Sequence, residues 1–370
     1  MKVADIIEIM ADMAPPHLAE DWDNSGLQFG SPGREVKNIF VALEPSLEAV
    51  HAAVSAGADM LIVHHPLIFR PLSVIDTDSP TGAVIETAAR NGLAVFAAHT
   101  NLDSAKGGVN DVLCEKIGLA DFSVLCPASG PQQYKVVVFV PEDHAANFID
   151  AVCQSPAGRI GTYSCCTFRS PGTGSFMPGT GSDPYDGVIG ELSEVSEVRM
   201  ETVVEKSDLD AVIAHLKAHH PYETMAYDVY PLVPESDGQG LGRIGRIRPA
   251  QTLGELARDL KKRLELPWVR FSGPADLVVE SAAVCSGSGG GLLGAFFASP
   301  AQVLITGDLR YHDAVDAVQR GRGLIDIGHF ASEHIVVDVI CARLREAVRA
   351  AGGSVAVCAF DREADPFVHV

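Results

Sequence analysis

Two stretches of the chain, residues 1–120 and 252–370, alternate short β-branched runs with longer amphipathic segments. This alternation is typical of βαβ units, in which helices connect neighbouring strands of a largely parallel sheet. In the first stretch we expect three strands and two helices, at Asn38–Leu43, Met60–Val63, Leu93–Ala98, Ser46–Ser55 and Gly82–Arg90. In the second we expect strands at Ala282–Cys285, Val303–Thr306, Leu324–Ile327 and Ser354–Phe360, and helices from Thr252 and over Ser332–Ala351. The pattern predicts an α/β fold with a three-layer host domain assembled from both ends of the chain.

The segment between these stretches has a different pattern of expected strands and helices. Residues 127–248 are expected to order their elements as β-α-β-β-α-β, which is the order of a ferredoxin-like α+β unit. The flanking sequences CPASGPQQ and PESDGQGLGRIG have the composition of linkers, and residues 170–187 (SPGTGSFMPGTGSDPYDG) that of a long loop. We therefore expect an inserted domain at 127–248 between host segments 1–126 and 249–370, interrupting one continuous sheet layer.

Composition excludes several classes of protein. With 47% hydrophobic and 21% charged residues, the chain is expected to fold. It has 28 Lys and Arg against 48 Asp and Glu, and this formal charge of −20 argues against binding to nucleic acid or to an anionic membrane surface. The uncharged run 281–307 could span a bilayer by length, but its glycines and Pro300 favour strand, loop and short helix.

The expected location of the protein is the cytoplasm. Asp5 and Glu8 occupy what would be the apolar core of a signal peptide, so we expect no secretory segment. The eight cysteines are scattered without the spacing of a zinc knuckle or a disulfide framework. We therefore interpret most of them, including Cys165 and Cys166 in an expected strand, as packing residues in a reducing environment.

Four expected host strands end in polar residues that can bind metal. They are followed by His64 and His65, by His99 and Asp103, by Asp308 and His312, and by His329 and Glu333. Glu333 stands four residues after His329, so a helix would place both on one side. In open α/β sheets, the carboxyl ends of the strands line the crevice where ligands bind. Each of these fragments alone is more often structural, and their convergence is what predicts a site.

The chemistry of the predicted site is that of a metal centre. Histidine and carboxylate together suit Zn, Mn and Fe alike. Two or three histidines would serve one ion, whereas the larger set is enough for two ions, with a carboxylate to bridge them and positions left for water. The predicted ligands are His64, His65, Asp103, His329 and Glu333. We also expect His99 or Asp308 to support them, since a ligating imidazole usually donates its other N–H to a neighbouring acceptor.

Five motifs extend over essentially the whole chain: WDNSGLQFG (22–30), HHPLIF (64–69), HTNLD followed by GGVND (99–111), GDLRYHDA (307–314) and GHFASE (328–333). In this order they resemble the GTP cyclohydrolase I type 2 family, also called the Nif3-like dinuclear-metal proteins. In the insert, GRIGTYSCCTF, GTGSF and HPYETMAYDVYPL resemble the extra domain of the longer members, which is similar to the PII and divalent-cation-tolerance fold. One departure is Glu44, followed by Pro45, where the family usually has an Asp.

The resemblance implies two divalent ions per subunit, held by the five predicted ligands, in a homohexamer whose sites face an internal cavity. It also implies a hydrolase that opens the guanine ring of GTP, or acts on a related nucleotide, with His99 or His312 as candidates for proton transfer. The alternative is a non-catalytic metal-binding regulatory or scaffold hexamer whose PII-like insert senses a ligand or a partner. The trimerisation expected of a PII-like insert and a second interface in the host would together close such a hexamer.

Three further motifs have more than one interpretation. His219-His220-Pro221 repeats His64-His65-Pro66, but it follows an expected helix whose carboxyl end is itself a structural reason for histidine. SGSGGG (286–291) is either a contact to substrate or a tight turn. GLGRIGRI (240–247) matches part of a dinucleotide fingerprint, but without a strand-turn-helix context we assign it no nucleotide.

Overall fold

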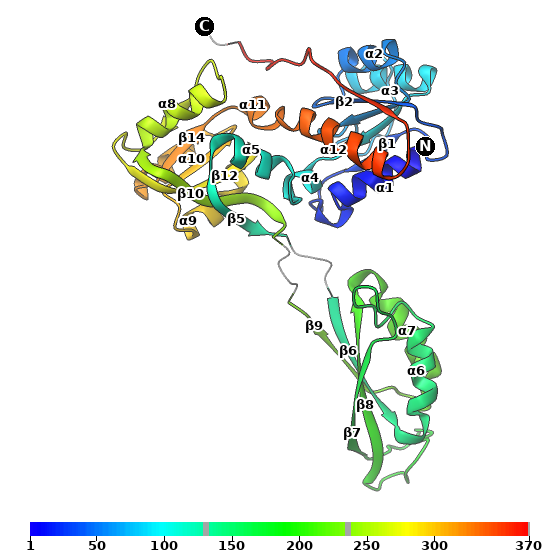
Figure 1. Cartoon of the computed structure of the whole chain (residues 1–370). Coiled ribbons are helices and arrows are strands. Elements are labelled where there is room, and N and C mark those ends of the chain that lie inside the picture. Colours follow the sequence, from blue (N-terminus) through cyan, green and yellow to red (C-terminus); the bar gives the residue numbers. More distant parts are fainter. Residues whose placement is uncertain (129–132, 234–237, 369–370) are drawn as a thin grey trace. The chain divides into compact units, whose positions relative to one another are not determined.

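The computed structural model describes residues 1–128, 133–233 and 238–368, and the chain divides into two compact units (Figure 1). The host unit combines Met1–Ala128 with Ser236–Val370, and the insert is Ser129–Glu235. Both expected linkers lie partly outside the described residues. The expected end of the insert at residue 248 is wrong, because β10 (Gly240–Thr252) pairs within a host sheet. The GLGRIGRI motif is therefore part of a strand.

The first host sheet has the order β1-β4-β3-β2-β15, with β1 antiparallel to β4 and the other pairs parallel. Its strands are β1 (Gly26–Phe29), β2 (Asn38–Ala42), β3 (Met60–Val63), β4 (Ala94–Ala97) and β15 (Ala356–Ala359). Alternate strand residues face opposite sides. Ile39 and Ile62 pack against α1 (Val3–Met13) and α12 (Val336–Ala350), while Leu61 and Val95 pack against α2 (Leu47–Ser55) and α3 (Pro80–Asn91). Both faces are thus buried under helices.

The second host sheet has the order β11-β14-β13-β12-β10-β5. Its strands, besides β10, are β5 (Ala120–Pro127), β11 (Arg270–Ser272), β12 (Val278–Ser288), β13 (Val303–Gly307) and β14 (Gly323–Asp326). Val284 and Ile305 pack against α5 (Val109–Ile117) and α8 (Leu253–Arg263). Ala283 and Leu304 face the other way, toward α9 (Leu293–Ala298) and α10 (Tyr311–Gln319).

The host is built on these two sheets, so the expectation of one continuous sheet layer is wrong. The chain passes from the first sheet to the second through α4 (Thr100–Ser104) and α5. It returns through α11 (His329–Glu333) and α12, which replace the single helix expected over Ser332–Ala351. Figure 1 shows these four helices between the two sheets. The carboxyl ends of β3, β4 and β14 lead directly into this region, which is where the predicted ligands lie.

The insert has the predicted order β-α-β-β-α-β. Its elements are β6 (Gln133–Pro141), α6 (Ala145–Cys153), β7 (Thr167–Phe176), β8 (Ser193–Glu205), α7 (Leu209–His219) and β9 (Tyr227–Pro231). The strands form an antiparallel sheet in the order β7-β8-β6-β9. Val136 and Val138 of β6 pack with Phe148 of α6 and Leu216 of α7. Part of the loop expected over residues 170–187 is therefore strand β7.

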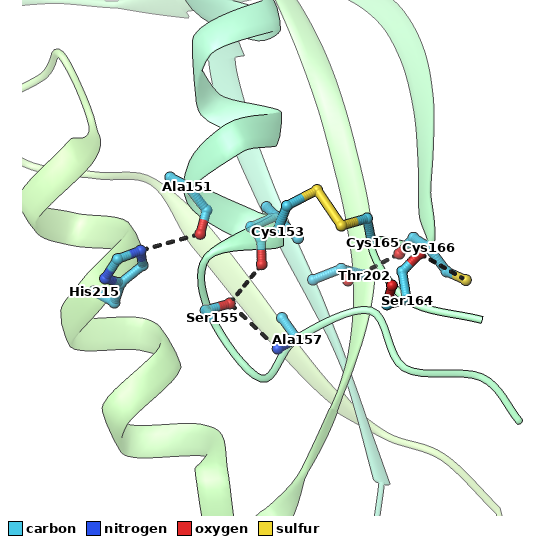
Figure 2. The surroundings of a disulfide bond; sticks show 10 residues. Ala151, Cys153, Ser155, Ala157, Ser164, Cys165, Cys166, Thr202 and His215 are labelled. Atoms are coloured by element: carbon cyan, nitrogen blue, oxygen red, sulfur yellow. Dashed lines mark hydrogen bonds between the residues drawn. A yellow bond between two sulfur atoms is a disulfide. The ribbon is translucent and has the colours of Figure 1, made fainter. Parts of the chain in front are cut away.

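A disulfide joins Cys153, at the end of α6, to Cys165, just before β7 (Figure 2). The expectation that these cysteines are packing residues is wrong, and Cys165 also precedes the strand in which we expected it. Thr202 of β8 donates a hydrogen bond to the carbonyl of Cys166 at 3.0 Å, which fixes the same segment to the sheet. Elsewhere in the insert, His220 contacts the carbonyl of Phe139 in β6 through Nε2 at 2.9 Å, so its role is structural, although the contact is to a strand and not to the helix end that we expected.

None of the helices in the described part of the chain combines the length and the apolar character needed to cross a bilayer. Residues 281–307, the uncharged run, form β12, α9 and β13 with the turns between them. The strand, loop and short-helix interpretation of this run is confirmed.

Candidate metal centre

The centre begins at the carboxyl end of β3, where the backbone holds two histidines side by side. The N–H groups of His64 and His65 both donate to the carbonyl of Leu43, at 3.1 and 3.0 Å. This shared acceptor turns the chain as the strand ends, and the ring centroids lie 5.0 Å apart. His64 is fully buried, and His65 lies at the edge of a cavity. The turn thereby brings the two neighbouring side chains to one site, as the sequence predicts.

Three imidazoles are oriented through their Nδ1 atoms. His64 Nδ1 donates to the carbonyl of Ala98 at 2.8 Å, and His65 Nδ1 to Glu44 Oε1 at 2.6 Å. His329 Nδ1 donates to Asp308 Oδ2 at 2.7 Å, so the predicted support by Asp308 is present. These bonds fix the tautomer and leave each Nε2 atom for the centre of the cluster. Glu44, the residue that departs from the family pattern, is one of the three orienting groups.

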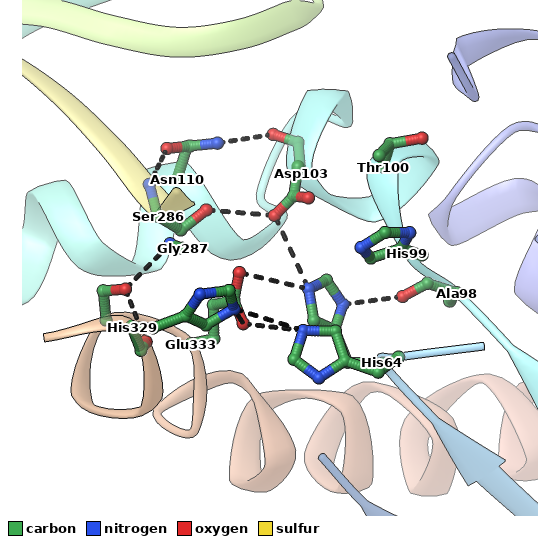
Figure 3. A network of polar contacts seen from close by, with 12 residues as sticks. His64, Ala98, His99, Thr100, Asp103, Asn110, Ser286, Gly287, His329 and Glu333 are labelled. Atoms are coloured by element: carbon green, nitrogen blue, oxygen red, sulfur yellow. Dashed lines mark hydrogen bonds and ion pairs between the residues drawn. The ribbon is translucent and has the colours of Figure 1, made fainter. Parts of the chain in front are cut away.

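Glu333 lies at the middle of the cluster (Figure 3). Its Oε2 atom is 3.0 Å from His65 Nε2 and 2.9 Å from His329 Nε2, and its Oε1 atom is 3.7 Å from His64 Nε2. Asp103 Oδ1 lies 3.8 Å from the same His64 nitrogen. Two donor groups result, His64 with Asp103 and Glu333, and His65 with His329 and Glu333, each with its ligand atoms within 4.8 Å of one another. Glu333 is common to both.

The cluster fits divalent metal ions. His64 Nε2 is buried and makes no hydrogen bond, since the nearest carboxylate oxygens, of Glu333 and Asp103, lie 3.7 and 3.8 Å away. A buried polar atom without a partner costs roughly 1–3 kcal/mol, and this cost is removed when a cation binds. Imidazole nitrogens and carboxylate oxygens are the donors that Zn, Mn and Fe accept. The five predicted ligands therefore converge, in an arrangement that an ion would complete.

The imidazoles and carboxylates of the cluster shift one another's pKa values. Burial opposes a charge on His65, but hydrogen bonds to Glu333 and Glu44 outweigh it and raise the pKa of His65 to about 10. The hydrogen bond to Glu333 likewise raises the pKa of His329 to about 9. Burial works against ionisation of Glu333 too, yet the surrounding imidazoles hold its pKa well below the usual range. For Asp103, burial dominates and raises the pKa. Metal ligands must be deprotonated, so binding of an ion has to displace these protons.

The glycine-rich run 286–291 supports the two carboxylates. Ser286 Oγ donates to Asp103 Oδ1 at 3.0 Å, and its backbone N–H donates to Asn110 Oδ1 at 2.9 Å. Gly287 has φ +58°, and a Cβ atom there would lie 2.1 Å from Glu333 Oε1. Only glycine permits this close approach without displacing the carboxylate. The run also turns, with Gly287 in the left-handed region and a 3-10 turn over Gly289–Leu292, so the tight turn expected as one of the two alternatives is present, while a contact to substrate stays a prediction.

Asp23 is a site residue that the sequence reasoning missed. His99 Nδ1 donates to Asp23 Oδ1 at 2.7 Å, and Ser25 Oγ and Thr100 Oγ1 donate to Oδ2 at 2.7 and 2.6 Å. Burial opposes ionisation of Asp23, but these bonds hold its pKa far below the usual range. The His99 ring lies 5.3 Å from that of His64, and the two can share a third donor group with His65. The signal was present in WDNSG, which we used only for the resemblance.

His312, the other predicted proton carrier, is not brought to the cluster. It is exposed at the start of α10, where its ring packs against Tyr311 with centroids 5.3 Å apart. None of the donor groups found among the described residues includes it. His312 is the second residue of α10, so the direction of its side chain is set by the orientation of that helix. The order of residues in the sequence does not show this orientation.

A cavity of about 1140 Å³ opens beside the cluster. His65 and His329 line it, so the metal centre is accessible from this side. The described residues that line this cavity include two cation–π pairs. Arg270 lies 5.8 Å from the centre of the Trp268 ring, and Arg362 lies 5.4 Å from the centre of the Phe360 ring. A cavity of this size accommodates a small molecule.

Comparisons with known proteins agree with the motifs. A family model for Duf34/NIF3 (NGG1p interacting factor 3) matches residues 1–366. The chain is 37% identical over 373 residues to a Halalkalibacterium halodurans protein (100% of each chain) and 40% identical over 328 residues to one from Bacillus subtilis (89% of this chain, 88% of the other). Both relatives are named "GTP cyclohydrolase 1 type 2 homolog".

Solved structures give the same result. A Bacillus cereus protein related to NIF3 is 40% identical, with a TM-score of 0.71 over 100% of this chain and 99% of that one. A Staphylococcus aureus protein is 29% identical, with a TM-score of 0.81 and the same coverage. Sequence and fold therefore agree along the whole length, and the chain belongs to the Duf34/NIF3 family.

Proposed function

We propose that this protein is a hydrolase that works with two divalent metal ions. The observation that carries the proposal is the position of Glu333, whose two carboxylate oxygens face two different groups of ligands. A carboxylate shared in this way is suited to bridging a pair of ions. Such a pair would supply Lewis-acid activation of water at neutral pH.

The residues divide the work of holding the ions. His64 and Asp103 would bind one ion and His65 and His329 the other, with Glu333 between them. Two carboxylates offset part of the charge of two divalent ions, and the small number of protein ligands leaves positions for water and substrate. The second-layer contacts from Asp308, Glu44 and Ser286 keep the ligands in place.

His99 is the proposed proton carrier. Asp23 accepts the hydrogen bond from its Nδ1 atom, which leaves Nε2 to take up or release a proton beside the cluster. The His99 ring is 5.5 Å from the His65 ring, close enough to act on a group held at the ions. Because His312 lies apart from the cluster, we no longer propose it for this role.

The proposed substrate is GTP or a related nucleotide. The names of the relatives suggest GTP, and the cavity beside the cluster is large enough for a nucleotide. Trp268 offers a ring on which a base can stack. The described residues of the lining include two arginines, of which Arg270 is paired with Asp326, and six carboxylates, so phosphate groups would need the cations bound at the metal centre to offset the negative charge. These cations matter because the chain as a whole carries a formal charge of −20.

The test is turnover by the purified full chain after loading with Zn, Mn or Fe. We expect release of formate or of another hydrolysis product from GTP or a related nucleoside triphosphate. In Glu333→Gln, metal content and turnover should fall together, whereas Glu346→Gln, an exposed change on α12, should leave both unchanged. A fully loaded protein that hydrolyses none of these nucleotides would contradict the proposal.

The alternative function is a metal-binding regulatory or scaffold assembly. It is favoured by the insert, which is a compact unit with its own core and its own cavity. For either function we propose a cytoplasmic homohexamer with a PII-like insert. Mass photometry should then report six 39.1-kDa chains, and a monomer or dimer at working concentration would overturn the assembly.

A further inference from the structure

The insert contains a cavity that the proposed hydrolase does not use. It has a volume of about 270 Å³ and lies among the end of β7, the segment that follows it, and the loop between α7 and β9. The motifs GTGSF and HPYET, which we singled out only for their resemblance, meet here through Gly174, Phe176 and Tyr222. A cavity built from two separate motifs is a candidate for ligand binding.

Three aromatic rings line this cavity. The Tyr222 ring lies 5.9 Å from that of Tyr185 and 6.2 Å from that of Phe176, and both pairs are tilted. Tyr185 is 49% exposed, so the cavity is open to solvent on its side. All three rings line the cavity, so a cation bound there would be in contact with aromatic surface, which attracts organic cations.

A carboxylate lies among the rings. Tyr222 donates its hydroxyl hydrogen to Glu197 Oε1 at 2.9 Å. This bond uses the only hydrogen of the phenol hydroxyl, so the hydroxyl has no donor left for an anionic ligand, while the negative charge of Glu197 remains at the cavity. A Cβ atom at Gly174 would lie 2.2 Å from Glu197 Oε2, so the absence of a side chain at this position lets the carboxylate occupy its place.

The charge of the lining is of one sign. Asp186, Glu197 and Glu223 contribute carboxylates, and no Lys or Arg is found among the described residues that line the cavity. The nearby His144 contacts the hydroxyl of Tyr185 at 2.9 Å, on the side of Asp143. A phosphate or a carboxylate would therefore be repelled, while a cation gains from both the rings and the acids.

We propose that this cavity binds a small molecule through an alkylammonium group, held between the rings of Phe176, Tyr185 and Tyr222 and the carboxylate of Glu197. The volume suits a group with the size of a trimethylammonium or a primary amine with a short chain. Binding at this cavity requires no metal and no turnover, so its test is independent of the test of the hydrolase function.

The test is isothermal titration of the full chain with choline and with tetramethylammonium. Dimethylbutanol, the uncharged carbon analogue of choline, has nearly the same shape and is the control ligand. We expect saturable binding of at least one of the two cations and none of the alcohol. Absence of saturable binding by both cations, or equal binding of the alcohol, would overturn the proposal.

Two variants locate the site. Glu197→Gln keeps the shape but removes the charge, and should weaken binding about tenfold, as expected for loss of one contact to a charged group. Gly174→Ala keeps the charge but displaces the carboxylate, and should weaken binding as well. The matched control is Glu194→Gln, an exposed change on the same strand that does not line the cavity. Unchanged affinity in both site variants, or equal loss in the control, would place the cation elsewhere and refute the proposal.

Discussion

Replacing Gly287 by alanine should disrupt the metal centre although every ligand remains in the sequence. The residue has φ +58°, a left-handed conformation that costs an alanine roughly 1–2 kcal/mol. The new methyl group would also lie 2.1 Å from Glu333 Oε1 and 3.4 Å from His329 Nε2. The first distance is well inside van der Waals contact, so either the strand or the carboxylate has to move.

The size of the effect depends on whether the backbone of β12 or the side chain of Glu333 moves. If the backbone of β12 moves, overpacking adds roughly 1–3 kcal/mol to the cost of the left-handed conformation, and the metal-free protein should lose about 2–5 kcal/mol of stability in total. If the Glu333 side chain moves, the loss of stability is smaller, but both donor groups lose their shared ligand. Metal affinity should then fall by about 10- to 100-fold or more, the range seen when groups that position ligands are removed.

The assay combines urea unfolding of the metal-free protein with titration of Zn or Mn. Gly291→Ala is the matched control, because it lies in the same glycine run and its added methyl would meet no atom within 4 Å. We expect the control to keep both its stability and its affinity. Wild-type stability together with wild-type affinity in Gly287→Ala would refute the close approach of Gly287 to Glu333.

Four further predictions concern charge. Glu44→Gln should weaken metal binding about tenfold by removing the charge that orients His65, and an unchanged affinity in a metal titration would contradict this role. At pH 7 metal binding should release protons, because the metal-free pKa values of His65 and His329 are about 10 and 9; calorimetry in two buffers of different ionisation enthalpy would measure this, and zero release would contradict it. The metal-free protein should also lose stability as pH rises from about 6.5 to 10, because over this range the histidines of the folded protein keep protons that the unfolded chain has already lost; urea unfolding across this range would measure it, and a constant stability would contradict it. Arg243→Met should destabilise the host by about 3–5 kcal/mol in urea, because it leaves the buried partner Asp111 unpaired, and a loss below about 1 kcal/mol would show that the pair is dispensable.

The convergence of the candidate ligands could be predicted from the sequence because their positions follow from strand ends. His64 and His65 stand immediately after a buried apolar run, and His329 and Glu333 have helical spacing after another. These local patterns are decided by chain direction and periodicity, which one sequence displays. The same holds for the βαβ alternation of the host and for the order of elements in the insert.

The remaining features depend on contacts between distant residues. The division of the host into two sheets depends on β5 pairing with β10, an antiparallel pairing across the insert that leaves no local pattern. Asp23 meets His99 from a loop 76 residues away, and Gly287 matters only because Glu333 approaches it. The disulfide of Cys153 joins a helix end to the start of a neighbouring segment, a proximity that the spacing of the cysteines does not reveal.

The most direct test of the dinuclear centre is anomalous diffraction from crystals of the full chain loaded with Mn or Zn. The account predicts two peaks roughly 3–4 Å apart, one bound by His64 and Asp103, the other by His65 and His329, with Glu333 in contact with both. A single peak at full occupancy, or two peaks of which only one contacts Glu333, would contradict it.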